Sequence, residues 1–129
     1  MIIINKNTEN KVVVTLKEKS EVTPSYPLFV FENAETGEEK IFTAQYINSS
    51  IRYDEFYITE SATTENLLTG LINITGNTAQ WNYKVYESSI DFSANTLSIS
   101  ATTGNIIEQG RLLVKGIQNN NNTINDIYL

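Results

Sequence analysis

Carboxylates are the side chains of this chain that could do chemistry, because it contains no histidine and no cysteine. The commonest general base, the commonest metal ligand and the thiol nucleophile are therefore missing. Adjacent acids such as Glu38 and Glu39, or Asp54 and Glu55, could in principle form a glycosidase pair. Neighbouring side chains on a strand point to opposite faces, however, so this spacing favours a structural role. The sequence predicts that the protein is not an enzyme.

A calcium site is the second kind of chemistry that the acids could support. Asp91, Glu87 and carbonyl groups between residues 88 and 105 would supply oxygen ligands, but the chain has no D-x-D-x-D spacing. It also has no Gly-rich phosphate loop and no G-x-S-x-G elbow. We therefore expect no metal site and no cofactor.

Net charge and hydropathy limit the classes of partner that the protein is expected to have. The formal net charge of −6 and the pI near 4.6 argue against nucleic acid, since phosphate binding needs clustered Lys and Arg. No run of about 20 apolar residues is present, and residues 1–4 are too short for the apolar region of a signal peptide. We expect a soluble protein that is neither exported nor bound to a membrane.

Aromatic rings could hold a sugar by stacking. Alternation places Trp81, Tyr83 and Val85 on one apolar face, which favours a core position for them. Exposed rings are expected instead at Tyr53, Tyr57 and Tyr86. The stretch 88–105 is long for a loop, and such loops often have a function. The residues that could form a ligand loop there are Tyr86, Ile90, Asp91 and Phe92.

Two hairpins are expected to organise these residues. In the first, residues 71–75 and 78–85 flank Gly76 and Asn77, a pair suited to a two-residue turn, which would place Ile72 opposite Trp81. A late strand over residues 109–116 would complete its sheet. The second hairpin spans residues 26–44, with a first strand buried on both faces and a left-handed glycine at Gly37. A small additional hairpin through residues 97–100 also fits the pattern.

Further strands are expected at residues 2–4, 11–16 and 56–59. Short strands separated by turn signals are typical of an all-β fold, an antiparallel immunoglobulin-like sandwich of about seven to eight strands, with a small closed barrel as the alternative. We expect one domain over residues 1–116 and an Asn-rich arm over residues 117–129.

Four runs carry a resemblance to a known family: R-Y-D-E-F at 52–56, N-L-L-T-G at 66–70, W-N-Y-K-V-Y-E at 81–87 and E-Q-G-R-L-L-V at 108–114. In these runs, and in its opening I-I-I-N-K followed by a Val-rich strand, the chain resembles small virion proteins of tailed phages that infect Bacteroidota, including the crAss-like group. The resemblance covers almost the whole chain in order and spacing.

The resemblance implies a non-enzymatic component of the virion. The leading expectation is an auxiliary capsid (head decoration) protein on the capsid exterior, which stabilises the major capsid protein lattice after assembly in the host cytoplasm. Its partners would be the major capsid protein, other virion proteins and its own copies. A tail or baseplate component and a glycan-binding adhesin module are the alternatives. The expected partner-binding residues are apolar and lie near the two ends: Ile2, Ile3, Ile4, Ile124, Ile127, Tyr128 and Leu129.

Overall fold

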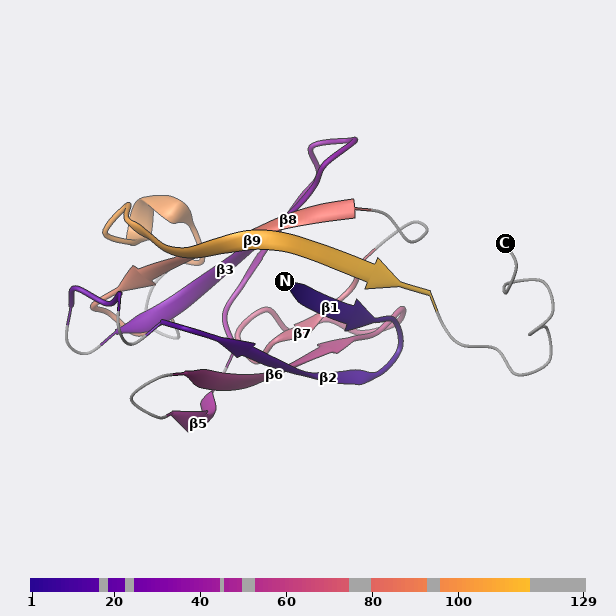
Figure 1. The fold of residues 1–129 in the computed structure, drawn as a ribbon, viewed down its shortest axis with the longest axis horizontal. Helices are drawn as coiled ribbons and strands as arrows, with labels where there is room; N and C mark the ends of the chain where they lie inside the picture. The colour runs from indigo at the N-terminus through magenta and orange to yellow at the C-terminus, as the bar shows by residue number, and fades with distance from the viewer. Residues whose placement is uncertain are drawn as a thin grey trace, which may run out of the picture.

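The computed structural model describes residues 1–16, 19–22, 25–44, 46–49, 53–74, 80–92 and 96–116, with backbone alone for 46–49 (Figure 1). Nearly all of its regular structure is β. The elements are β1 (Ile2–Asn5), β2 (Glu9–Val14), β3 (Tyr26–Asn33), β4 (Glu39–Phe42), β5 (Tyr46–Ser49), β6 (Asp54–Glu60), β7 (Leu71–Ile72), β8 (Gln80–Ser88), the short 3-10 helix η2 (Ile99–Ala101) and β9 (Ile106–Lys115).

The strands form two sheets that pack as a sandwich. One sheet has the order β1-β9-β8-β3-β4, and the other has the order β2-β6-β5 with β7 also paired to β6. This division matches the immunoglobulin arrangement. In the letters used for immunoglobulin strands, β2, β6 and β5 take the places of B, E and D, and β3, β8 and β9 take those of C, F and G in the facing sheet. The predicted all-β sandwich is therefore confirmed. Most pairs are antiparallel, while β1–β9 and β6–β7 are parallel.

The core between the sheets is built around four phenylalanine rings. Phe29 stacks on Phe42 at 5.3 Å between ring centroids and meets Phe56 edge-on at 5.1 Å. Phe31 packs edge-on against Phe42 at 4.8 Å. Trp81 and Tyr83 are buried in the same cluster, as the alternation predicted. Such aromatic pairs add to the free energy gained from burial.

A second, smaller cluster lies on the outer face of the five-stranded sheet. Because β3 is buried on both faces, its Leu28 and Val30 point away from the main core and pack against Tyr86 and Phe92. The segment around η2 covers them with Leu97, Ile99 and Ala101. The predicted small hairpin at residues 97–100 is wrong, since this region forms η2.

The predicted hairpin over residues 70–87 is also wrong. β7 pairs in parallel with β6 in one sheet, whereas β8 pairs with β3 and β9 in the other. Trp81 therefore lies opposite Asn33 and Leu112, and not opposite Ile72. The long strands β3 and β9 offer β8 far more backbone pairing than the five residues 71–75 of the predicted hairpin could. The proposed turn at Gly76 and Asn77 lies outside the described residues.

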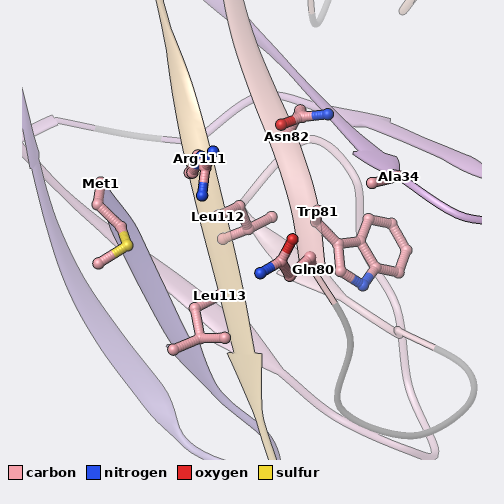
Figure 2. A pocket seen from close by; sticks show the side chains of 8 residues that line it. All are labelled: Met1, Ala34, Gln80, Trp81, Asn82, Arg111, Leu112 and Leu113. Carbon is pink, nitrogen blue, oxygen red and sulfur yellow. The ribbon is translucent and has the colours of Figure 1, made fainter.

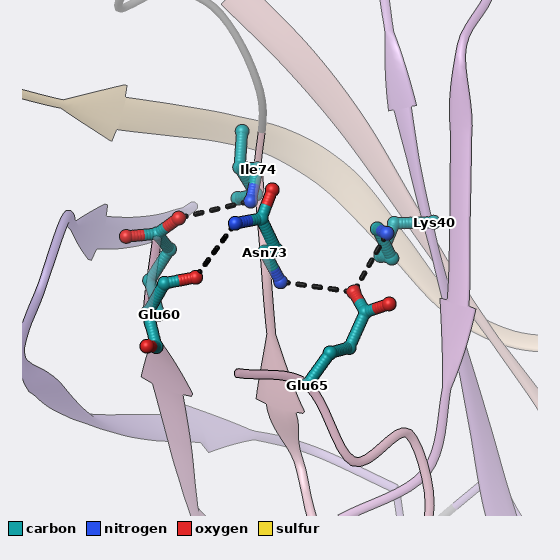
Figure 3. Close-up of polar contacts among 6 residues, drawn as sticks. Lys40, Glu60, Glu65, Asn73 and Ile74 are labelled. Carbon is teal, nitrogen blue, oxygen red and sulfur yellow. Dashed lines mark hydrogen bonds and ion pairs between the residues drawn. The ribbon is translucent and has the colours of Figure 1, made fainter. Parts of the chain in front are cut away.

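Polar contacts explain where the chain goes after β7 (Figure 3). Glu60 accepts hydrogen bonds from the Ile74 N–H at 2.9 Å and the Asn7 N–H at 2.8 Å. Glu65 accepts one from the Asn73 N–H at 3.0 Å and pairs with Lys40 of β4 at 2.7 Å. These carboxylates hold residues 73–74 beside the smaller sheet, and the Lys40 pair connects that segment to the larger one.

The second predicted hairpin and the late strand are confirmed. β3 and β4 pair antiparallel, and Gly37 has φ +77°. The side-chain oxygen of Asn33 accepts hydrogen bonds from the N–H groups of Glu35 and Thr36, which fixes the turn. β9 completes the sheet beside β8. No helix among the described residues is long and apolar enough to span a membrane.

Candidate interaction surface

The predicted ligand loop is divided between core and surface. Tyr86 is 8% exposed and Phe92 is 2% exposed, because both belong to the cluster under η2. The expectation of an exposed ring at Tyr86 is therefore wrong, since β3 supplies an apolar outer face that it covers. Ile90 and Asp91 are exposed. Two of the four candidate ligand residues, Ile90 and Asp91, therefore lie at the surface.

Glu87, the proposed partner of Asp91 in a cation site, has a structural role. It is fully buried and accepts hydrogen bonds from the hydroxyl groups of Ser20, at 2.7 Å, and Ser25, at 2.8 Å, and from the Glu21 N–H at 2.8 Å. The carboxylate thus anchors the segment that leads into β3. In the described parts of the chain, acids do not gather in groups of three that could hold a metal ion.

The N-terminal isoleucines lie on an edge strand, and they alternate between core and surface. Ile2 and Ile4 are 3% and 0% exposed and pack in the main core, whereas Ile3 is 42% exposed. Of these three predicted contact residues, Ile3 alone therefore offers its side chain to a partner. Ile124, Ile127, Tyr128 and Leu129 lie outside the described residues.

The first hollow on the surface, here called the outer-face hollow, has a volume of about 360 Å³. Strand register brings its residues together, because Leu113 pairs with Ile3 of β1 and with Gln80 of β8, and Arg111 pairs with Asn82. Figure 2 shows the lining side chains of β8 and β9 together with Met1 and Ala34. It is lined by Met1, Ala34, Gln80, Trp81, Asn82, Arg111, Leu112 and Leu113.

Trp81 reaches the outer-face hollow only from a buried position, because its ring packs in the main core. Its Nε1–H is buried and has no hydrogen-bond partner among the described residues. Asn82 and Arg111 present amide and guanidinium groups on the exposed side. The hollow therefore combines hydrogen-bond donors with an apolar floor, which suits contact with another molecule.

The second hollow, here called the edge hollow, has a volume of about 210 Å³ between β1 and β2. It is lined by Met1, Ile2, Ile3, Lys11, Val12 and Val13. Lys11 pairs with Glu55 at 2.9 Å, and the hydrogen bond and charge of Glu55 raise the pKa of Lys11. The other exposed side chains here are apolar, with Met1 77% and Val13 52% exposed.

Together the two hollows flank an exposed apolar strip of Met1, Ile3 and Val13. Its neighbours come from residues near 1, 12, 81 and 112, which are far apart in the sequence. The sequence predicted the strand at residues 2–4 but not this surface, because the parallel pairing of β1 with β9 leaves no local signal. An exposed apolar strip between hollows is typical of a surface that contacts a macromolecule.

Comparisons with known proteins add little to this surface. No protein-family model matches the chain, and no curated protein matches it. One similar solved structure is a putative glycoside hydrolase from Bacteroides vulgatus ATCC 8482, with 9% sequence identity and a TM-score of 0.43. The match covers 95% of this chain but only 17% of that one, so the chain spans about a sixth of the length of that protein.

Proposed function

We propose that the chain is a non-enzymatic structural protein of a phage virion, an auxiliary capsid protein that binds and stabilises the major capsid protein lattice from the outside. The observation that carries the proposal is the exposed apolar strip of Met1, Ile3 and Val13 beside two hollows. The resemblance to virion proteins of Bacteroidota phages supports the proposal that the particle is a phage virion.

The placement of the acids favours a binding role over a catalytic one. Glu60 and Glu87 are fully or almost fully buried, and both accept hydrogen bonds from protein groups. Adjacent Glu38 and Glu39 are both exposed and lie at the start of β4, an edge strand of its sheet. The outer face of β1, β9 and β8 is instead the surface that would contact the lattice.

Cryo-electron microscopy of the native particle tests this location. We expect density for the sandwich at lattice copy number on the capsid, with the outer face of β1 and β9 against a capsid subunit. Density confined to the portal axis would make the chain a tail or baseplate component. Its absence from the particle would overturn the virion role.

A surface variant tests the contact itself. Replacing Ile3 and Leu113 by Asp would place charges on the outer face, and we expect the folded variant to be lost from purified particles. The matched control is Ile106→Asp, which changes a side chain that is 41% exposed at the other end of β9. Equal incorporation of the two folded variants would contradict the assigned face.

Glycan binding is the second candidate function, and the outer-face hollow favours it. Gln80, Asn82 and Arg111, which line the hollow, can form hydrogen bonds with sugar hydroxyl groups. A glycan array with the folded chain checks this candidate. Binding that is lost in Asn82→Ala and Arg111→Ala would establish it, whereas silence across the array would count against it.

A further inference from the structure

The search for a further site leads to the free edge of β1. Within the described chain, β1 is the last strand of its sheet and pairs with β9. The Lys6 N–H donates to the Lys115 carbonyl at 3.0 Å, so the even-numbered residues direct their backbone groups towards β9. The N–H and C=O groups of Ile3 and Asn5 therefore face the opposite way, towards β2.

Asn10 of β2 already completes one end of this edge. Its side-chain oxygen accepts a hydrogen bond from the Asn5 N–H at 2.9 Å, and its Nδ2–H donates to the Asn5 carbonyl at 3.1 Å. A side chain thus replaces strand pairing beside the β1–β2 turn. The next outward-facing residue, Ile3, lies at the edge hollow, and no side chain of the described residues is seen to bond its backbone as Asn10 bonds that of Asn5.

The facing edge of β2 presents matching groups. The Glu60 N–H donates to the Thr8 carbonyl at 3.1 Å, and Thr8 precedes a strand in which even-numbered residues continue to face β6. Lys11 and Val13 therefore direct their backbone groups towards the edge hollow. Among the described residues, these strand edges have no pairing partner on this side, and the space between them has a volume of about 210 Å³.

β1 itself carries none of the charged side chains that edge strands normally present, although Lys11 of β2 lines the hollow opposite it. Proteins place charges on open strand edges to prevent further pairing, and β4, at the other end of the same sheet, carries Glu39 and Lys40. β1 instead reads Ile-Ile-Ile-Asn, and Val13 stands exposed opposite it. Such an edge is suited to receive an added strand.

We propose that the edge hollow is a strand-docking site whose occupant is residues 124–129 of the same chain. β9 ends at Lys115, beside Lys6 on this edge. Residues 116–123 can span up to roughly 26 Å. The free side of β1 lies two strand spacings from β9, roughly 10 Å away. The linker therefore reaches the edge and gives an effective concentration in the millimolar range.

The sequence of the segment fits an edge strand. Ile127 and Leu129 are two residues apart, so in an extended conformation both side chains point to one face and can enter the hollow. The preceding run of four asparagines supplies a polar linker. This proposal rests on the geometry of β1 and β2. A docked segment would cover Val13 and the edge hollow, whereas the outer face of β1, β9 and β8 would stay open to a partner.

Disulfide trapping tests the docking. Because the chain has no native cysteine, only the introduced cysteines can form a disulfide. Val13→Cys is combined in turn with Asn125→Cys, Ile127→Cys and Leu129→Cys, and the dilute chain is oxidised. We expect an intramolecular disulfide in at least one pair, with a yield at least about tenfold above a control pair that joins Glu35→Cys to the same position. Glu35 is exposed in the β3–β4 turn.

Equal yields in test and control pairs would show that the segment does not dock, and would overturn the proposal. Disulfide-linked dimers at the same dilution would assign the occupant to a second copy and would also overturn it. Amide hydrogen exchange gives an independent readout on the full-length chain. We expect Ile127→Asn with Leu129→Asn to accelerate exchange at Ile3 by about tenfold or more; unchanged exchange would count against docking.

Discussion

Gly70 is the residue at which backbone geometry constrains the fold most tightly. It has φ +78°, and a Cβ there would lie 2.9 Å from both the Ala44 Cβ and the Tyr57 carbonyl oxygen. Gly37 has nearly the same φ, +77°, but open space around it. We expect Gly37→Ala to cost about 1 kcal/mol of unfolding free energy from backbone strain alone, and Gly70→Ala to cost at least about 1 kcal/mol more.

Urea unfolding of both glycine variants measures this difference. The two substitutions are chemically identical, so Gly37→Ala is the matched control for strain without a close contact. Equal destabilisation of the two variants would mean that the close approach of the Ala44 Cβ and the Tyr57 carbonyl oxygen to Gly70 does not constrain this position.

Glu87 provides a second prediction at the residue scale. Its replacement by Ala would leave the Ser25 hydroxyl group and the Glu21 N–H without their acceptor in a partly buried place, and the Ser20 hydroxyl with the Val22 carbonyl alone. We expect a loss of about 1–3 kcal/mol in unfolding free energy, measured by chemical denaturation. Glu35→Ala, at an exposed position, is the control and should stay within about 0.5 kcal/mol of the wild type.

At the scale of elements, the sequence predicted strands better than it predicted their partners. Alternation identified β2, β6 and β9, a continuous apolar run identified β3, and the turn chemistry of Asn33 and Gly37 identified the β3–β4 hairpin. The predicted pairing of β7 with β8 was wrong because both strands have an apolar face, which includes Ile72 in one and Trp81 in the other. An apolar face shows that a strand packs against the core, but it does not show which sheet the strand joins. The sequence did not predict β5, because residues 46–49 lie in a stretch whose pattern is polar and irregular.

The candidate surface could be predicted only in part, for a related reason. The position of Ile3 on an edge strand follows from local sequence, but its neighbours Leu113 and Val13 come from long-range pairing. The outer cluster was missed because Tyr86 and Phe92 become buried only when η2 folds over Leu28 and Val30. Burial on an outer sheet face depends on a cover that strand periodicity does not encode.

β1 offers an element-scale prediction, because a free arm and an integral strand respond differently to mutation. Ile4 is 0% exposed in the core, so Ile4→Ala should cost about 2–5 kcal/mol of unfolding free energy. Ile3→Ala, one residue away and 42% exposed, should cost about 0.5 kcal/mol or less. Urea unfolding measures both, and a neutral Ile4→Ala would show that β1 does not pack as a strand.

At the scale of the whole molecule, Glu65 connects the two halves of the sandwich through its contacts with Lys40 and Asn73. Partial burial acts to raise the pKa of Glu65, but the hydrogen bonds from Lys40 and Asn73 and the Lys40 charge outweigh it, so the pKa lies below its ordinary value. A carboxyl group with a lowered pKa stabilises the fold fully above its unfolded-state pKa, near 4.3. That contribution is lost as the pH falls towards the folded-state pKa.

The sign of this linkage gives a prediction for acid unfolding. The melting temperature of the wild type should fall between about pH 5 and pH 3, and Glu65→Gln should lower it at neutral pH and flatten the fall in acid. Thermal unfolding across this range measures the effect. The control is Glu35→Gln, whose carboxyl group is exposed and away from Lys40. A curve for Glu65→Gln parallel to that of the wild type would show that the acid response has another origin than the contact between the two sheets.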